Sequence, residues 1–277
     1  WQGDAAIAFR DSMIDGSLRF CERNWCPHVS DAAAGIPNDT VVPHEQAPVY
    51  KQTAHPVHVN LNYDLTCNLR CPTCRHQLIH YNGVELDKVR KLQHYVETNI
   101  LPHVQSVALT GVGDPFMSKI FKEFLFQFDK KKYPKLKRMH FHTNGLLFDE
   151  KMFEKMKGIH HLQLSTDISI DAASKDTYQK VRPPGDWDKL QTNLQFIKDI
   201  PQMKEIGISM VVQQDNYHEM LDFIALGERM CKKGSTFVEF KRARQYQHLN
   251  DEQYSKIGVD FLAGQNMSDF KSLAAKV

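Results

Sequence analysis

Three cysteines, Cys67, Cys71 and Cys74, stand close together in the stretch VHVNLNYDLTCNLRCPTCR. Thiolates are soft ligands that select zinc, copper(I) or iron–sulfur clusters. A structural zinc site has four ligands, and His76 could supply the fourth. Three thiolates can instead hold a [4Fe-4S] cluster and leave one iron open to another ligand. No fourth cysteine lies nearby, which favours the cluster and leaves zinc as the alternative.

The cysteines come directly after a stretch in which apolar and polar residues alternate. Val57, Val59 and Leu61 are its apolar members. A period of two residues is typical of a β-strand. We therefore expect a strand over 57–63 that runs into the cysteine loop.

A C-x3-C-x2-C motif directly after a first strand resembles the signature of the radical S-adenosylmethionine (SAM) superfamily. The resemblance implies that a [4Fe-4S] cluster on Cys67, Cys71 and Cys74 binds SAM through its open iron. It further implies reductive cleavage of SAM to a 5′-deoxyadenosyl radical, which abstracts a hydrogen atom from a substrate.

From residue 57 onward, strand-like and helix-like patterns alternate six times, which is typical of an α/β fold with parallel strands. The predicted strands are 57–63, 105–110, 137–142, 161–170, 206–213 and 235–241. The predicted helices are 84–98, 118–129, 149–157, 174–179, 187–199 and 216–231. The expected N-caps are Asp149, Ser174 and Asn216. Six units match the partial (β/α)6 barrel of radical SAM cores, with the active site at the C-terminal strand ends.

Four further segments resemble SAM-binding motifs of the superfamily, each at the end of a predicted strand. GVGDP resembles a GGEP-type motif, and TNG resembles a segment beside the cofactor. SIDAA with a following T-Y and Arg resembles a motif of SPASM-associated members, and V-V-Q-x-x-N-x-x-E-M resembles a later one. The candidate SAM-binding residues are Gly111, Gly113, Asp114, Pro115, Thr143, Asn144, Ser169, Asp171, Arg182 and Gln213.

The resemblance also implies roles for three of these residues. Ser169 would bind the SAM ribose or carboxylate, Gln213 would reach the ribose, and Arg182 would pair with the carboxylate. Arg182 could alternatively be an exposed cation at a helix end. GVGDP and TNG could likewise be plain turns.

Charged residues close the sixth predicted strand, where the substrate is expected. They are Glu239, Lys241, Arg242 and Arg244, and their alternative role is as solvated charges. Cys231, in a predicted helix with apolar neighbours, is interpreted as a core thiol.

The N-terminal 30 residues contain a predicted amphipathic helix that ends at Gly16. Cys21 and Cys26 follow in an order that resembles the end of a SPASM-type domain, which binds auxiliary iron–sulfur clusters. The cysteines that precede the helix in such domains are missing here, so these two could be buried or free thiols. The expected organisation is a SPASM-like fragment (1–30), a linker (31–56), the barrel (57–245) and a C-terminal helical segment (246–277).

Composition narrows the class of protein. The 277 residues are 42% hydrophobic and 25% charged, enough for one sizeable core. A formal net charge of +2 does not favour nucleic acid, and no apolar run reaches the length of a membrane span. We expect a cytoplasmic enzyme that receives electrons from a reductase, flavodoxin or ferredoxin. Its expected substrate is a peptide; a sugar, nucleotide or other small metabolite is the alternative, and a non-catalytic metal-binding module is the alternative of another class.

Overall fold

Six strands pair in parallel, each with the next strand along the chain. The computed structural model describes residues 3–15, 17–21, 55–109, 111–230, 236–244 and 249–259. The chain divides into two compact units, residues 1–56 and 57–277, and the sheet belongs to the second. The strands are β1 (His58–Leu61), β2 (Ser106–Leu109), β3 (Arg138–Thr143), β4 (Gln163–Ser169), β5 (Met203–Val212) and β6 (Thr236–Arg242).

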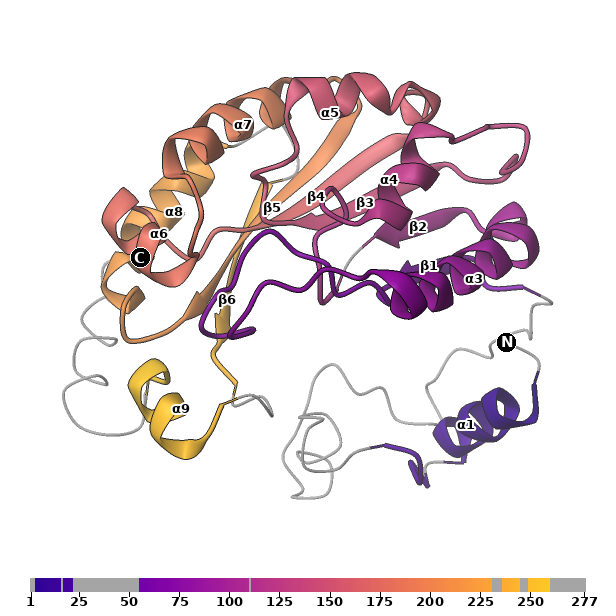
Figure 1. Cartoon of the computed structure of the whole chain (residues 1–277), viewed down its shortest axis with the longest axis horizontal. Helices are drawn as coiled ribbons and strands as arrows, with labels where there is room; N and C mark the ends of the chain where they lie inside the picture. The colour runs from indigo at the N-terminus through magenta and orange to yellow at the C-terminus, as the bar shows by residue number, and fades with distance from the viewer. Residues whose placement is uncertain are drawn as a thin grey trace. The chain divides into compact units, whose positions relative to one another are not determined.

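Most of the helices alternate with these strands and lie around the outside of the sheet, whereas the last one follows β6 and lies apart from them (Figure 1). The helices are α3 (Gly83–Asn99), α4 (Lys119–Phe126), α5 (Glu150–Lys155), α6 (Lys175–Val181), α7 (Trp187–Asp199), α8 (Met220–Arg229) and α9 (Asp251–Ile257). Single turns of 3-10 helix are η2 (Leu101–His103), η3 (Lys157–Ile159) and η4 (Tyr217–Glu219). The predicted α/β fold, a partial (β/α)6 barrel, is confirmed. Of the predicted C-terminal helical segment, residues 246–248 and 260–277 lie outside the described residues.

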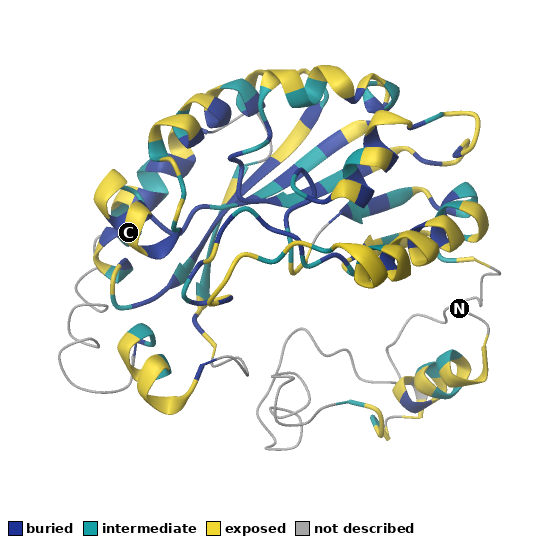
Figure 2. Cartoon of the chain, in the orientation of Figure 1, coloured by how far each residue is buried: buried dark blue, intermediate teal, exposed yellow. Residues whose placement is uncertain are grey.

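The two faces of the sheet differ in polarity. On one face, apolar side chains such as Phe141, Ile168 and Ile208 are fully buried beneath the helices. On the other, His140 and Asp167 are only partly buried. Figure 2 shows buried residues along the strands and exposed residues mainly on the outward sides of the helices. Parallel sheets covered on both faces are normally apolar throughout, so a polar face is a candidate functional surface.

An aromatic cluster fills the core beneath the ends of β2 and β3. The ring centre of Phe116 lies 4.5 Å from that of Phe148 and 5.2 Å from that of Phe141. All three side chains are completely buried. Because Phe116 follows GVGDP directly, burial of its ring anchors this loop to the core.

Two of the three predicted N-caps are present. Asp149 accepts a hydrogen bond from the backbone N of Met152, and Ser174 accepts one from that of Thr177. The prediction for Asn216 is wrong, because its side chain makes no cap hydrogen bond to η4. Its amide binds the loop backbone instead, as described below.

The first unit contains helix α1 (Asp4–Ile14), and the chain then turns back along it. The backbone N of Leu18 donates to Ser12 O at 2.9 Å, and Cys21 Sγ lies 3.8 Å from Met13 Sδ. Trp1, Gly16, Cys26 and Cys231 lie outside the described residues, as does most of the predicted linker. None of the described helices combines the length and apolar character needed to cross a bilayer.

The aromatic cluster gives a first prediction. Phe141→Ala should lower the free energy of unfolding by about 3–5 kcal/mol, because it removes a fully buried ring and leaves a cavity. Phe126→Ala is the matched control: its ring is 40% exposed, so its loss should cost less than about 1 kcal/mol. Denaturant unfolding of both variants checks this, and equal losses would contradict the packing described here.

Candidate functional site

The C-terminal ends of the strands meet at one edge of the sheet, because the strands are parallel and in sequential order. Leu61, Leu109 and Phe141 lie side by side across β1, β2 and β3. Leu61 and Leu109 are the last residues of β1 and β2, and Phe141 lies two residues before the end of β3. The loops that follow therefore share this edge. The predicted site residues lie in these loops or at the ends of β3 and β4, except for Arg182, which is the C-cap residue of α6.

The three cysteines occupy a loop fixed by backbone hydrogen bonds. The N of Cys67 donates to Ile79 O at 3.2 Å, and the N of Cys74 donates to Cys71 O at 2.9 Å. Arg70 N donates to Pro183 O at 2.8 Å, which ties the loop to the segment after α6. Cys67 and Cys71 are buried, whereas Cys74 is exposed. The loop thus presents one thiol outward and two inward.

N–H donors surround the sulfur atoms. Leu69 N and Asn144 Nδ2 lie 3.5 Å and 3.9 Å from Cys67 Sγ, and Arg75 donates to Cys74 Sγ. Burial raises the pKa of Cys71 to about 11, a rise that the charge of Arg182 opposes. Within the described residues, no three His, Cys, Asp or Glu side chains are arranged to share a single metal ion.

Asp114 joins the loops after three strands. Its backbone N donates to Thr66 O at 2.8 Å, in the cysteine loop. Its Oδ2 accepts from Thr143 Oγ1 at 2.7 Å and from Asn144 N at 2.9 Å, in the loop after β3. Its Oδ1 accepts from Phe116 N at 3.0 Å. Both carboxylate oxygens of Asp114 therefore accept hydrogen bonds from other residues of the protein, in addition to the hydrogen bond made by its backbone N.

The glycines of the GVGDP loop serve close packing against the cysteine loop. A Cβ on Gly113 would lie 2.3 Å from Asp64 O and 2.7 Å from Thr66 O. Gly111 has a φ of 116°, which L side chains rarely adopt. Pro115, the last residue of the motif, is buried. The two loops form one packed unit.

Asp171 and Arg182 form a buried ion pair. Arg182 Nη2 lies 2.6 Å from Asp171 Oδ2, and both side chains are at most 10% exposed. Asp171 Oδ1 accepts from Val211 N at 2.7 Å. Burial raises the pKa of Asp171, and the adjacent guanidinium opposes the rise. The alternative of an exposed cation at a helix end is therefore wrong for Arg182.

The loop after β5 supports this pair. Asn216 Nδ2 donates to the carbonyl oxygens of Asp171 and Val211, and its Oδ1 accepts from Gln213 N. Glu219 accepts hydrogen bonds from Ala173 N and from the hydroxyls of Ser174 and Thr177 at the start of α6. These bonds hold the helix that carries Arg182.

Three buried donors in this region have no acceptor among the described residues. They are Arg182 Nε, Gln213 Nε2 and the hydroxyl of Tyr178 on α6. A buried donor without a partner is costly, so such atoms are candidates for hydrogen bonds to a ligand. Arg182 and Gln213 were among the residues predicted to contact SAM.

The polar face of the sheet carries Ser169, which was predicted from the sequence, together with His140, His142, Asp167 and Ser209, which were not. His142 Nε2 and Ser169 Oγ share a hydrogen bond of 3.1 Å, and Ser209 Oγ donates to Ser169 Oγ at 3.3 Å. His140 lies 3.7 Å from Asp167. On β6, Lys241 pairs with Glu239 at 2.9 Å, while Arg242 and Arg244 are exposed. The signal for the missed residues was present: polar residues alternate with Met139, Phe141 and Ile168 along β3 and β4.

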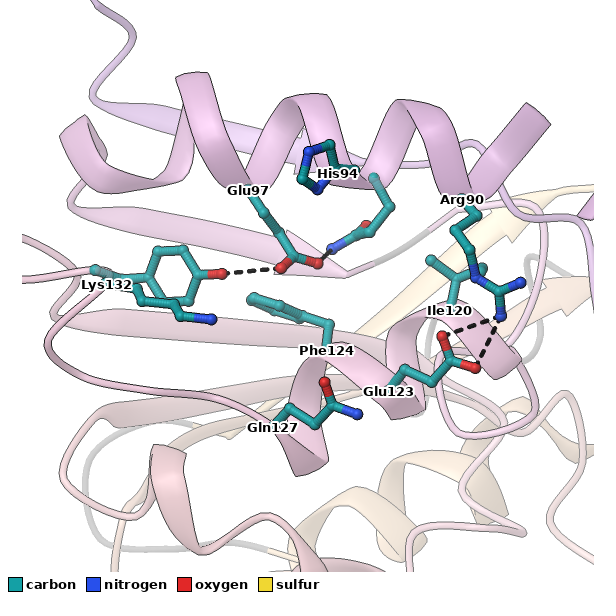
Figure 3. A pocket seen from close by; sticks show the side chains of 10 residues that line it. Arg90, His94, Glu97, Ile120, Glu123, Phe124, Gln127 and Lys132 are labelled. Atoms are coloured by element: carbon teal, nitrogen blue, oxygen red, sulfur yellow. Dashed lines mark hydrogen bonds and ion pairs between the residues drawn. The ribbon is translucent and has the colours of Figure 1, made fainter. Parts of the chain in front are cut away.

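Two cavities are lined by described residues of the second unit. One, of about 190 Å³, lies between α3 and α4, where Glu97 accepts from Gln93 and Tyr133, and Arg90 pairs with Glu123 (Figure 3). The carboxylates of Glu97 and Glu123 in this cavity are thus already hydrogen-bonded or paired with neighbouring side chains. The other, of about 360 Å³, lies beside the cysteine loop and is lined by Thr66, His80, Tyr81, Asn82, Leu86, Met117, Lys119 and Lys122.

A family model described as the radical SAM superfamily matches residues 64–227, more than half of the chain. No match was found among curated proteins. The fold is similar to that of Streptococcus suis SuiB bound to S-adenosylmethionine, with a TM-score of 0.52, 14% identity, and coverage of 80% of this chain and 47% of SuiB.

SuiB bound to precursor peptide SuiA gives a TM-score of 0.51 at 12% identity, with coverage of 98% of this chain and 59% of SuiB. TYW1 with a lysine-pyruvate adduct bound gives a TM-score of 0.46 at 15% identity, with coverage of 79% of this chain and 72% of the TYW1 chain. This chain therefore matches about half of the length of the SuiB chains. At these identities the two likenesses to SuiB show the fold alone.

The environment of His142 predicts a pH dependence of stability. Burial, together with the nearby charges of Lys241, His140 and Arg182, lowers the pKa of His142 from 6.5 to about 4. As pH falls below 6.5 the unfolded chain gains this proton first, so stability is lost between pH 6.5 and 4. Replacement by glutamine should remove roughly 2 kcal/mol of the stability loss between pH 7 and pH 5. The free energy of unfolding of the unaltered chain and of the His142→Gln variant, measured across this pH range, checks the prediction. Parallel pH profiles of the two would contradict it.

Proposed function

Because the chain belongs to the radical SAM superfamily, we propose that it is an enzyme that uses a [4Fe-4S] cluster and SAM to abstract hydrogen from a substrate. The observation that carries the proposal is the packing of the cysteine loop against the GVGDP and TNG loops through Asp114 and Gly113. A cysteine motif used only for folding would not need these adjoining loops at the same edge of the sheet.

The residues of the cysteine loop fit a cluster. Cys67, Cys71 and Cys74 supply three thiolate ligands, the set that leaves one iron open. Buried thiols such as Cys71 hold their protons strongly, and binding to iron provides the positive charge that replaces the proton. N–H donors near Cys67 and Cys74 are of the kind that tune iron–sulfur clusters.

The residues after β4 and β5 fit SAM, which carries a carboxylate and a ribose rich in acceptor oxygens. Arg182 Nε and Gln213 Nε2 are buried donors without a partner among the described residues, and they are available to these groups. Ser169 lies at the end of β4, and its hydroxyl is reached by His142 and Ser209. The Arg182 guanidinium is already paired through Nη2, so we assign Asp171 to holding Arg182 rather than to touching SAM.

Cys67, Cys71 and Cys74 would hold the cluster, which would supply the electron needed for reductive cleavage of SAM and so for hydrogen abstraction from the substrate. The chain's own residues hold and orient the partners of this reaction. Asp114 fixes Thr143 and Asn144 beside the cysteine loop, and the Asp171–Arg182 pair keeps a charged donor buried near Cys71.

The polar face of the sheet supports a polar substrate. His140, His142, Asp167, Glu239 and Lys241 offer donors and acceptors of both charges. This set suits a peptide, and SuiB, which shares the fold, has been solved with a precursor peptide. A sugar, nucleotide or other small metabolite is the alternative, since the same groups would bind hydroxyls or phosphates.

Three accompanying predictions concern partners and the N-terminal unit. The electron donor, a reductase, flavodoxin or ferredoxin, stays a prediction. So do membership of the SPASM-associated subgroup and an auxiliary cluster at Cys21 and Cys26, because Cys26 lies outside the described residues.

Metal content tests the proposal. Anaerobically reconstituted chain should hold about four irons in a brown cluster, and replacement of Cys67, Cys71 and Cys74 by alanine should remove them. The matched control, Cys21→Ala with Cys26→Ala, should keep these four irons and lose only any iron beyond them. Zinc bound in place of iron, in a colourless protein, would favour the non-catalytic metal-binding module. Full iron content in the triple variant would refute the assigned ligands.

SAM affinity tests the assignment at β4. Ser169→Ala should weaken SAM binding by roughly tenfold, the loss expected for one hydrogen bond to a charged or polar group. Ser165→Ala is the matched control: it lies on the same face of β4, four residues earlier, and its hydroxyl binds His140. Equilibrium binding to the reconstituted protein measures both, and equal dissociation constants for the two variants would remove Ser169 from the site.

A further inference from the structure

Arg75 follows the third cysteine and has an unusual environment for an arginine. Its side chain is buried, with 8% of its surface exposed. Among the described residues, no carboxylate lies within ion-pair distance of its guanidinium. A buried charge is strongly unfavourable unless it is paired and hydrogen-bonded. The partners that Arg75 does have should therefore explain why it is there.

Two of those partners are backbone carbonyls on different loops. Arg75 Nη1 donates to Leu65 O at 2.7 Å, in the segment between β1 and the cysteines. Nη2 donates to Val112 O, in the middle of the GVGDP loop. The guanidinium thus ties the cysteine loop to the loop after β2, on which part of the predicted SAM site lies.

The third partner is a sulfur atom. Arg75 Nε and Nη2 both lie 3.4 Å from Cys74 Sγ, so two donors of the planar fork face one thiol. Cys74 is the exposed member of the three predicted cluster ligands. Once Cys74 binds a cluster as a thiolate, its sulfur would give this buried cation an anionic partner.

We propose that Arg75 is a positioning residue that orients Cys74 and raises the reduction potential of the cluster bound there. The inference rests on the proposed function. Hydrogen bonds to ligand sulfurs and a nearby positive charge favour the more negative, reduced state of an iron–sulfur cluster. The same guanidinium holds the cysteine loop against the GVGDP loop through its hydrogen bonds to the carbonyl oxygens of Leu65 and Val112.

Arginine is specifically required by this geometry. Its fixed fork contacts two carbonyls and one sulfur at once, whereas the single ammonium of lysine cannot reproduce that arrangement. Lysine would keep the charge and lose most of the hydrogen bonds. Glutamine would lose the charge and most of the bonds.

The test is a redox titration of the reconstituted full chain, followed by electron paramagnetic resonance, with iron content measured on the same samples. Arg75→Gln should lower the ratio of reduced to oxidised cluster at a fixed potential by about tenfold, or about 59 mV for one electron. Arg75→Lys should fall between this variant and the unaltered chain. Arg70→Gln is the matched control, since Arg70 is an exposed arginine in the same loop, and it should leave the potential unchanged.

An unshifted potential in an iron-loaded Arg75→Gln variant would overturn the proposal while leaving the proposed function intact. An equal shift in Arg70→Gln would also overturn it, because any charge in the loop would then have the same effect. If Arg75→Gln does not load iron, Arg75→Lys decides: a lowered potential supports the role of the fork, and an unchanged one refutes it. If the unaltered chain itself binds no cluster, both the proposed function and this inference fail.

Discussion

The buried carboxylate of Asp114 is the interaction on which the arrangement of the site depends. It accepts hydrogen bonds from the loop after β3, while its own backbone N binds the cysteine loop. Burial raises the pKa of Asp114, and the surrounding N–H and O–H donors counter that rise. Loops after three separate strands are thereby held in one geometry, although they are far apart in sequence.

The division of the sheet into two faces separates stability from function. Side chains such as Phe141 and Ile208 pack beneath the helices and supply the core. The opposite face carries hydrogen-bonded polar residues, among them His142, Ser169 and Ser209. Buried polar groups on such a face lower stability unless each has a hydrogen-bond partner. Here some do not: Asp167 Oδ1 has no hydrogen-bond partner among the described residues. Groups left in this state are suited to bind a substrate.

Much of the fold was predictable because the period of two in strands and the alternation with helices are local signals. Roles that depend on partners far along the chain were not. Asn216 has the residue type of an N-cap, yet its amide reaches back to Asp171 and Val211. The burial of Arg182 depends on Asp171, which faces it only once β4 and α6 are in place.

The same limit applies to the site. Cys67, Cys71 and Cys74 could be predicted as ligands from their spacing, since ligands in one loop need no tertiary information. Asp114 was predicted to contact SAM as part of the GVGDP loop, but the hydrogen bonds of its carboxylate with Thr143 and Asn144 could not be predicted, because these partners lie far along the chain. Arg75 carried no signal in sequence, because a basic residue in a loop is usually solvated; only its burial and its contact with Cys74 distinguish it.

The central claim is that the loops at the strand ends assemble a site for SAM cleavage, and it is tested most directly by the products. Iron-loaded protein incubated anaerobically with SAM and a strong reductant should form 5′-deoxyadenosine and methionine in equal amounts, as measured by mass spectrometry. Protein lacking Cys67, Cys71 and Cys74 should form neither. Iron-loaded protein that binds SAM but yields no 5′-deoxyadenosine under reduction would contradict the account.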